Sequence, residues 1–143
     1  MIYLGSDHAG FELKEQIKEY LDDRSIEYQD LGANSTEPID YPAIAKSVAQ
    51  KVAGDANNRG ILFCRSGQGM AIAANRTHEI RAALAWTPEV AAESRRDNNS
   101  NILSLPAGYV TTDDAVNIIQ TWLDTKFSGA ERHIRRIAQI DQQ

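Results

Sequence analysis

The sequence predicts an α/β protein, a three-layer sandwich in which helices cover both faces of a parallel sheet of five strands. The main observation is that short apolar runs, typical of buried strands, alternate along the chain with segments of helical periodicity. A strand, a helix and a further strand in that order join through a right-handed crossover, which makes the strands parallel. Polar or glycine-rich turns follow two of the strands, at the sheet edge where ligands bind in such folds.

The first half of the chain contains three of the expected strands. Residues 1–6 form the first, and a helix over residues 9–22 follows because its apolar residues recur on one face. The second strand is expected at residues 26–32, before a polar loop that contains two prolines. A second helix over residues 42–54 ends at Gly54, a residue suited to a helix C-cap. The third strand is the apolar run "RGILFC", residues 59–64.

The second half repeats the alternation. A third helix begins at residue 69, and the fourth strand is expected at residues 80–86. The helix over residues 88–98 has Pro88 in its first turn, where proline is favoured. The fifth strand, residues 101–106, precedes a helix over residues 111–127 that Thr112 or Asp113 could cap. Residues 129–143 are expected to form a final helix or helical tail.

Length and composition are those of a single globular domain. A chain of 143 residues buries about two-thirds of its unfolded surface, and no apolar run approaches the roughly 20 residues that span a bilayer. No signal peptide is visible, and a single free cysteine fits the reducing cytoplasm. The net charge of −5 argues against a general nucleic-acid binder.

Four strand ends are expected to meet at one edge of the sheet: residues 6–8, 64–69, 86–88 and 105–108. Asp7 and His8 follow the first strand. Asp7 could simply cap the first helix, or the two side chains could bind sugar hydroxyls and transfer protons. The residues alone leave both interpretations open.

The only cysteine, Cys64, ends the third strand and precedes "RSGQG". A lone cysteine is most often a buried apolar residue. The cation of Arg65 and a nearby helix N-terminus would instead favour the thiolate, which can act as a base or a nucleophile. The amides of "SGQG" suit an anion, although the motif is neither a P-loop nor a dinucleotide fingerprint.

The segment "ERHIRRIAQ" concentrates positive charge in an acidic protein. On a helix, Arg132 shares one face with Arg136 and with Arg135, and two guanidinium groups on one face suit a phosphate. A solvated cationic surface explains the same residues more simply.

Five stretches in register, "YLGSDHAGFELK", "DYP", "GILFCRSGQGMAIAANR", "SRRDNNSNIL" and "FSGAERHIRRI", resemble the ribose-5-phosphate isomerase B family, which is grouped with galactose-6-phosphate isomerase subunits. The resemblance extends to about Ile140. It implies one Rossmann-like domain over residues 1–143 that acts as a homodimer, or as a tetramer of paired dimers. Each site would lie at the subunit interface, against which the tail of residues 129–143 would pack. It also implies isomerisation of a phosphorylated sugar through an enediolate, without cofactor or metal.

The resemblance also assigns roles to residues that match the family's motifs. It implies that Cys64 is the catalytic base, that Ser66 is the hydroxyl residue beside it, and that amides of the glycine-rich loop hold the enediolate. The residues implied to bind the substrate are Asp7, His8, Tyr41, Gly67, Gln68, Gly69, Asn98, Arg132 and Arg136.

Three residues depart from the family's pattern. Asp97 stands where the family usually has a ring-opening histidine, Gly108 where it commonly has an arginine, and Arg65 where it usually has a glycine. Aspartate can also shuttle a proton, but its ordinary pKa of about 3.9 makes it a poor acid at neutral pH unless burial raises that pKa. We hypothesise that Arg65 restores the charge missing at Gly108, or pairs with Asp97 across the interface. Arg65 and Asp97 therefore complete the predicted site.

Interconversion of ribose 5-phosphate and ribulose 5-phosphate is the leading functional prediction. An isomerase of another aldose phosphate or of a free sugar is the alternative within the enzyme class. A catalytically silent sugar-phosphate binding protein is the alternative outside it. The presence of Cys64 and Ser66 argues against the silent protein, because binding alone needs no base.

Overall fold

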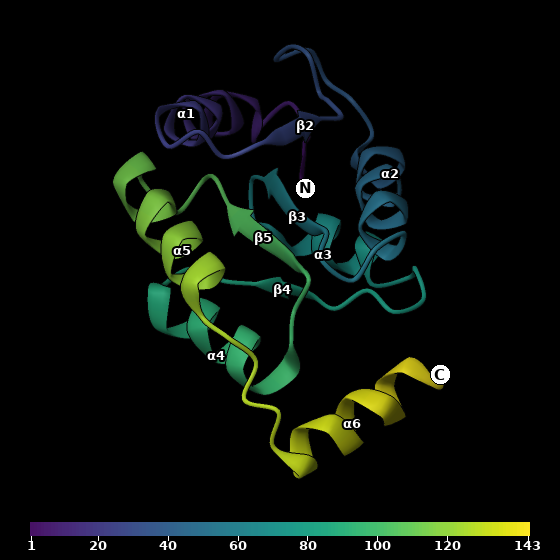
Figure 1. The fold of residues 1–143 in the computed structure, drawn as a ribbon. Helices are drawn as coiled ribbons and strands as arrows, with labels where there is room; N and C mark the ends of the chain where they lie inside the picture. The colour runs from purple at the N-terminus through teal and green to yellow at the C-terminus, as the bar shows by residue number, and fades with distance from the viewer.

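A computed structural model describes the whole chain, residues 1–143, as one sheet with six helices (Figure 1). The strands are β1 (Ile2–Ser6), β2 (Tyr28–Asp30), β3 (Arg59–Cys64), β4 (Ala82–Leu84) and β5 (Ile102–Pro106). The helices are α1 (Phe11–Asp23), α2 (Tyr41–Ala53), α3 (Gln68–Ala74), α4 (Pro88–Asn98), α5 (Thr112–Asp124) and α6 (Glu131–Asp141).

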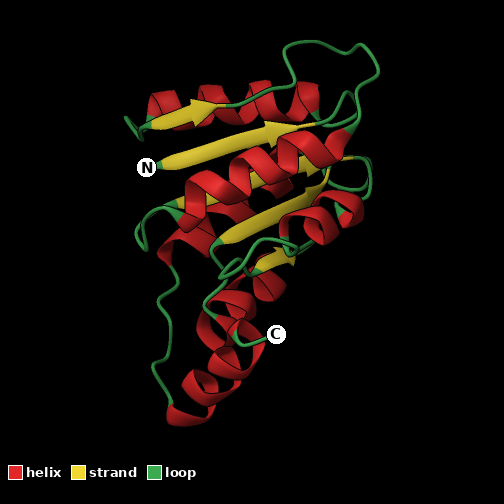
Figure 2. Ribbon diagram, turned by 90° about the vertical axis from the view of Figure 1, so that its right-hand side faces the viewer, coloured by secondary structure: helices red, strands yellow, loops and turns green.

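The five strands form one parallel sheet in the order β2-β1-β3-β5-β4, which confirms the predicted fold class. All the arrows in Figure 2 point the same way. The central strand β3 and its neighbour β5 are almost fully buried. The edge strands β2 and β4 have only three residues each and are shorter than the sequence predicts. The apolar residues that predicted each edge strand continue past the residues that pair, because an edge strand has a neighbour on one side only.

Two apolar clusters hold the three layers together. On one face, Leu13 and Ile17 of α1 and Ile118 and Trp122 of α5 pack on the sheet. On the other face, residues of α2 and α3 pack around Leu62 and Cys64 of β3. Figure 1 shows α1, α4 and α5 on one side of the sheet and α2 and α3 on the other.

A buried ion pair joins α1 to the end of β2. Lys14 is fully buried, and its ammonium donates to both carboxylate oxygens of Asp30 at 2.6 Å and to the carbonyl of Ala33 at 2.8 Å. Burial alone would raise the pKa of the Asp30 carboxyl, but hydrogen bonds from Lys14, the Gly32 amide and Lys18 lower it overall. The backbone that follows β2 pairs in turn with Ser6, the last residue of β1.

Most of the predicted helix ends are close to those observed, but the predicted cap of α5 is wrong. Pro88 begins α4 and Gly54 is the C-cap of α2, as the sequence predicts. The cap of α5 is Thr111 rather than Thr112 or Asp113, because the Thr111 hydroxyl and the Asp114 carboxylate satisfy each other's backbone amides in a capping box.

The last helix, α6, stands away from the rest of the molecule (Figures 1 and 2). It packs mainly on α4, and only His133 among its residues is buried. Ile134 and Ile140 remain about half exposed. Within this chain α6 is held by the buried His133 and by an ion pair of Asp141 with Arg81 at 3.1 Å, while much of its apolar surface stays uncovered. No helix in the structure combines the length and apolar character that crossing a membrane requires.

Candidate active site

After β1 the chain continues to β2 at one edge of the sheet, and after β3 it continues to β4 at the other edge. Polar residues gather beyond the ends of β1 and β3. Ligands usually bind beyond the carboxyl ends of the strands at such a change of direction. The three central strand ends are tied together there. The amide of Asp7 donates to the Phe63 carbonyl at 3.1 Å, and the Ala107 amide donates to the Cys64 carbonyl at 2.8 Å.

Asp7 is buried and closes the turn that enters α1. Its Oδ1 accepts from the Gly10 amide at 2.8 Å. Gly10 is itself the N-cap residue of α1 and no side chain caps the helix, so Asp7 holds the turn before α1 and the prediction that it caps the first-turn amides is wrong. Glycine is required at position 10, because a Cβ there would lie 2.2 Å from the Phe63 carbonyl oxygen. The close approach brings Asp7 near enough to Cys64 for its charge to act on the thiol.

Cys64 is 5% exposed and faces the α2–α3 side of the sheet. Burial raises the pKa of its thiol, hydrogen bonds from the Met70, Gly67 and Ser66 amides oppose that rise, and the charge of Asp7 adds to it. The prediction that a neighbouring cation and a helix end would favour the thiolate is therefore wrong for the resting protein. The amides act as expected, but burial outweighs them.

The glycine-rich loop is shaped around this sulfur. Gly67 has a left-handed backbone with φ of 73°, and its carbonyl accepts from the Ser104 hydroxyl at 2.6 Å. The Gln68 amide donates to the Ser66 hydroxyl at 3.3 Å. The Gly69 amide donates to no acceptor within the chain and is free to bind a ligand oxygen.

Tyr41 contacts the glycine-rich loop, and His8 follows β1 at the same edge of the sheet. The Tyr41 ring lies against Gly69, so close that a Cβ on that glycine would be 2.6 Å from the ring. His8 is exposed, and its Nδ1 accepts from the Ile39 amide at 3.3 Å. An accepting Nδ1 leaves the hydrogen of a neutral imidazole on Nε2, which can then donate to a hydroxyl.

Arg65 and Gly108 are in contact. The Gly108 amide donates to the Arg65 carbonyl at 2.9 Å, and a Cβ at position 108 would lie 3.1 Å from Cγ of Arg65. The stem of Arg65 thus occupies the space where a side chain at position 108 would begin. Residues Asp7, His8, Tyr41 and 64–69 together form what we call the carboxyl-edge group.

The remaining predicted residues form a second set, the arm group: Asp97 and Asn98 at the end of α4, with Arg132 and Arg136 on α6. Both arginines and Asn98 are exposed. No hydrogen bond or ion pair joins the arm group to the carboxyl-edge group within one chain. The structure therefore assembles the predicted site as two separate parts.

A histidine that the sequence analysis did not select lies within the arm group. His133 is buried, its Nδ1 is 2.8 Å from the Ser128 hydroxyl, and its Nε2 is 3.9 Å from Oδ1 of Asp97. Asp97 also accepts from Arg96 at 3.2 Å, and its side chain is 40% exposed. The sequence signal for His133 was its position between Arg132 and Arg135 in the basic segment.

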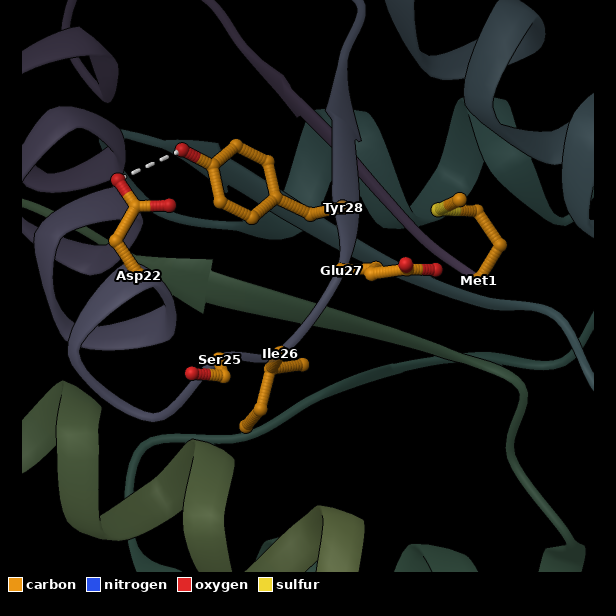
Figure 3. A pocket seen from close by; sticks show the side chains of 6 residues that line it. All are labelled: Met1, Asp22, Ser25, Ile26, Glu27 and Tyr28. Atoms are coloured by element: carbon orange, nitrogen blue, oxygen red, sulfur yellow. Dashed lines mark hydrogen bonds between the residues drawn. The ribbon is translucent and has the colours of Figure 1, made fainter.

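A cavity of about 620 Å³ between Met1, Asp22 and Tyr28 contains none of these residues (Figure 3). It opens at the amino end of β1 and β2, away from Cys64. No group of three or more His, Cys, Asp or Glu side chains is placed to hold a metal ion.

Comparisons with known proteins agree with one another. Residues 2–140 match the family model described as Ribose/Galactose Isomerase. The ribose-5-P isomerase B of Listeria innocua is 38% identical over 143 residues, which are 99% of this chain and 97% of the relative. The crystal structure of a ribose 5-phosphate isomerase from Thermotoga maritima is 47% identical, with a TM-score of 0.96 over 99% of this chain and 97% of that one. The isomerase B of Mycoplasma genitalium, solved with bound ribulose-5-phosphate, is 37% identical, with a TM-score of 0.94 over 99% and 93% of the two chains.

Proposed function

The chain belongs to the ribose/galactose isomerase family, and we propose that it interconverts ribose 5-phosphate and ribulose 5-phosphate. The observation that carries the proposal is a buried cysteine that ends β3 at the carboxyl edge of the sheet, directly before a glycine-rich loop whose Gly69 amide is unpaired. A small molecule held beside Cys64 would meet a base, a hydroxyl and a free amide at once.

The reaction moves one proton between two carbons and another between two oxygens. The Cys64 thiolate takes the proton from C2 of the open-chain aldose, and the C2–H electron pair becomes the C1–C2 double bond of an enediolate. The free Gly69 amide stabilises the oxygen that carries the developing charge. The thiol returns its proton to C1, while the Ser66 hydroxyl passes a proton from O2 to O1. Aldose becomes ketose with no net change in protons or electrons.

The arm group supplies the other end of the site in this proposal. Arg132 and Arg136 bind the phosphate, and Asn98 and Asp97 bind the sugar and its ring oxygen. Because these residues do not meet Cys64 within one chain, we propose that a second copy contributes them. The protein is then a homodimer with two shared sites, or a tetramer of such dimers, and residues 129–143 lie at the interface. We also place the protein in the cytoplasm, where the free thiol of Cys64 stays reduced.

A panel of pentose and hexose phosphates and free sugars tests the substrate, with Cys64→Ala and Cys64→Ser as variants. Ribose 5-phosphate should be turned over best, and both variants should lose at least about a hundredfold in kcat. Undiminished turnover by Cys64→Ala would exclude the cysteine as the base. Preference for a hexose phosphate would point instead to a pocket altered by Arg65, Asp97 and Gly108.

Mixing two inactive variants tests the shared site. Cys64→Ala and Arg132→Gln homodimers each lack one part of every site. In a one-to-one mixture after subunit exchange, half of the dimers are mixed and each has one intact site. Activity should therefore recover to about a quarter of wild type. A mixture that stays inactive after exchange, as shown by differently tagged chains, would refute the shared site.

A further inference from the structure

Three arginines gather at the amino ends of the strands, at the edge of the sheet opposite Cys64. Arg59 begins β3, Arg81 directly precedes β4, and Arg95 in the last turn of α4 donates to residues that precede β5. Arg59 and Arg81 line a cavity of about 300 Å³, whose other polar lining residues are Glu79, Asn99, Asn101 and Asp141. This volume is at the lower end of the range for small-molecule sites.

The cluster has more positive charge than the carboxylates around it balance. Arg81 pairs with Asp141 at 3.1 Å, whereas no carboxylate lies within 4.0 Å of the Arg59 or Arg95 guanidinium. Burial and the charge of Arg81 lower the pKa of the Arg59 guanidinium. Burial lowers the pKa of Arg95 to about 10, and the charges of Arg59 and Arg81 add to that effect. Two partly buried guanidinium groups are therefore left without a counter-ion.

Both arginines that line the cavity keep unused hydrogen-bond donors. Nη1 of Arg59 donates to two carbonyls of the loop before β3 at 2.9 and 2.8 Å, and its Nε and Nη2 have no acceptor in the chain. Arg81 uses its Nε and Nη1 on two carbonyls and on Asp141, and its Nη2 has no acceptor. Unused N–H groups on two neighbouring guanidinium groups suit the oxygens of one phosphate.

We propose that this cavity is a second anion site, in which Arg59 and Arg81 bind the phosphate group of a small phosphorylated compound. A phosphate monoester carries nearly two negative charges at neutral pH and so balances the two guanidinium groups that lack a counter-ion. The site is separate from the isomerase site of the same chain. Arg59 and Cys64 are at opposite ends of β3, roughly 16 Å apart along the strand.

Calorimetric titration with inorganic phosphate, at constant ionic strength in sodium chloride, tests the site. The titration uses an Arg132→Gln/Arg136→Gln double variant, which removes the phosphate-binding residues of the proposed function. This double variant should still bind one phosphate per chain. Adding Arg59→Gln should weaken that binding at least about tenfold, because a charge-assisted hydrogen bond is lost. Adding Glu79→Gln instead is the matched control, since it removes a negative charge from the same cavity and should leave binding at least as tight.

The proposal fails if the double variant binds no phosphate, or if Arg59→Gln binds it as tightly as its parent. Acetate binding with the affinity of phosphate would also overturn it, because the cavity would then not select a dianion. Weaker binding by the Glu79→Gln variant would contradict the charge argument. Arg59 donates only to carbonyls of its own loop, so its variant should fold, which thermal unfolding verifies. The titration needs no turnover and is independent of the isomerase function.

Discussion

The contact between Tyr41 and Gly69 predicts a variant that separates activity from stability. In Gly69→Ala, the added Cβ would lie 2.6 Å from the nearest ring atom of Tyr41 and 2.8 Å from its hydroxyl. The ring must retreat by about 0.8 Å before carbon atoms reach an ordinary separation of about 3.4 Å. Tyr41 is 37% exposed and can move outward without disturbing the core.

Gly69→Ala should affect stability and activity in opposite directions. Residue 69 lies in the first turn of α3, where alanine in place of glycine contributes up to about 1 kcal/mol of helix stability. The displaced ring no longer borders the substrate correctly, and a misplacement of about 1 Å can cost about a hundredfold in rate. We therefore expect an unchanged or slightly higher melting temperature, with kcat/KM lowered about tenfold to a hundredfold.

Thermal unfolding and a coupled isomerase assay measure the two effects side by side. Gly54→Ala is the matched control, because its Cβ would meet only the Lys51 and Gln50 carbonyls, at 3.4 and 3.9 Å. In a Tyr41→Ala background the clash is absent, so Gly69→Ala should cost nothing further there. Wild-type kcat/KM in Gly69→Ala, or a melting temperature several degrees lower, would refute the reasoning.

Three further predictions follow from charges in the structure. Because burial raises the pKa of the Cys64 thiol, kcat/KM should still rise with pH above about 8.5, close to tenfold per unit below that pKa; a flat pH–rate profile would count against the cysteine as base. Asp30→Asn leaves the buried Lys14 ammonium with only the partly exposed Glu15 carboxylate, 3.5 Å away, and should lower the free energy of unfolding by about 3 kcal/mol at neutral pH. Denaturant titrations should show that the difference in free energy of unfolding between wild type and Asp30→Asn shrinks only below about pH 4, because the folded protein lowers the pKa of Asp30. A difference that does not depend on pH would contradict the ion pair. Arg65→Gly should raise the KM for ribose 5-phosphate about tenfold or more if Arg65 provides the charge absent at Gly108, and an unchanged KM would end that hypothesis.

The sequence predicts the parts of this fold that depend on local pattern. The order of strands and helices, the burial of β3 and the pairing of Asp7 with the end of β3 all follow from hydrophobic periodicity and parallel topology. The pKa direction of Cys64 could not be predicted, because it depends on a balance between burial and three amides that only packing determines. The contact of Arg65 with Gly108 likewise joins residues from two loops. The positions of Arg132 and Arg136 in the sequence also do not show that these residues lie apart from Cys64 within one chain.

The position of α6 has a consequence for how the protein would behave in dilute solution. This helix has little packing within its own chain, yet it carries the two arginines assigned to the phosphate. If the proposed dimer separates, each subunit keeps Cys64 but lacks the arginines that bind the phosphate. Specific activity would then depend on protein concentration, falling as chains separate, and dilution alone would act as an off-switch.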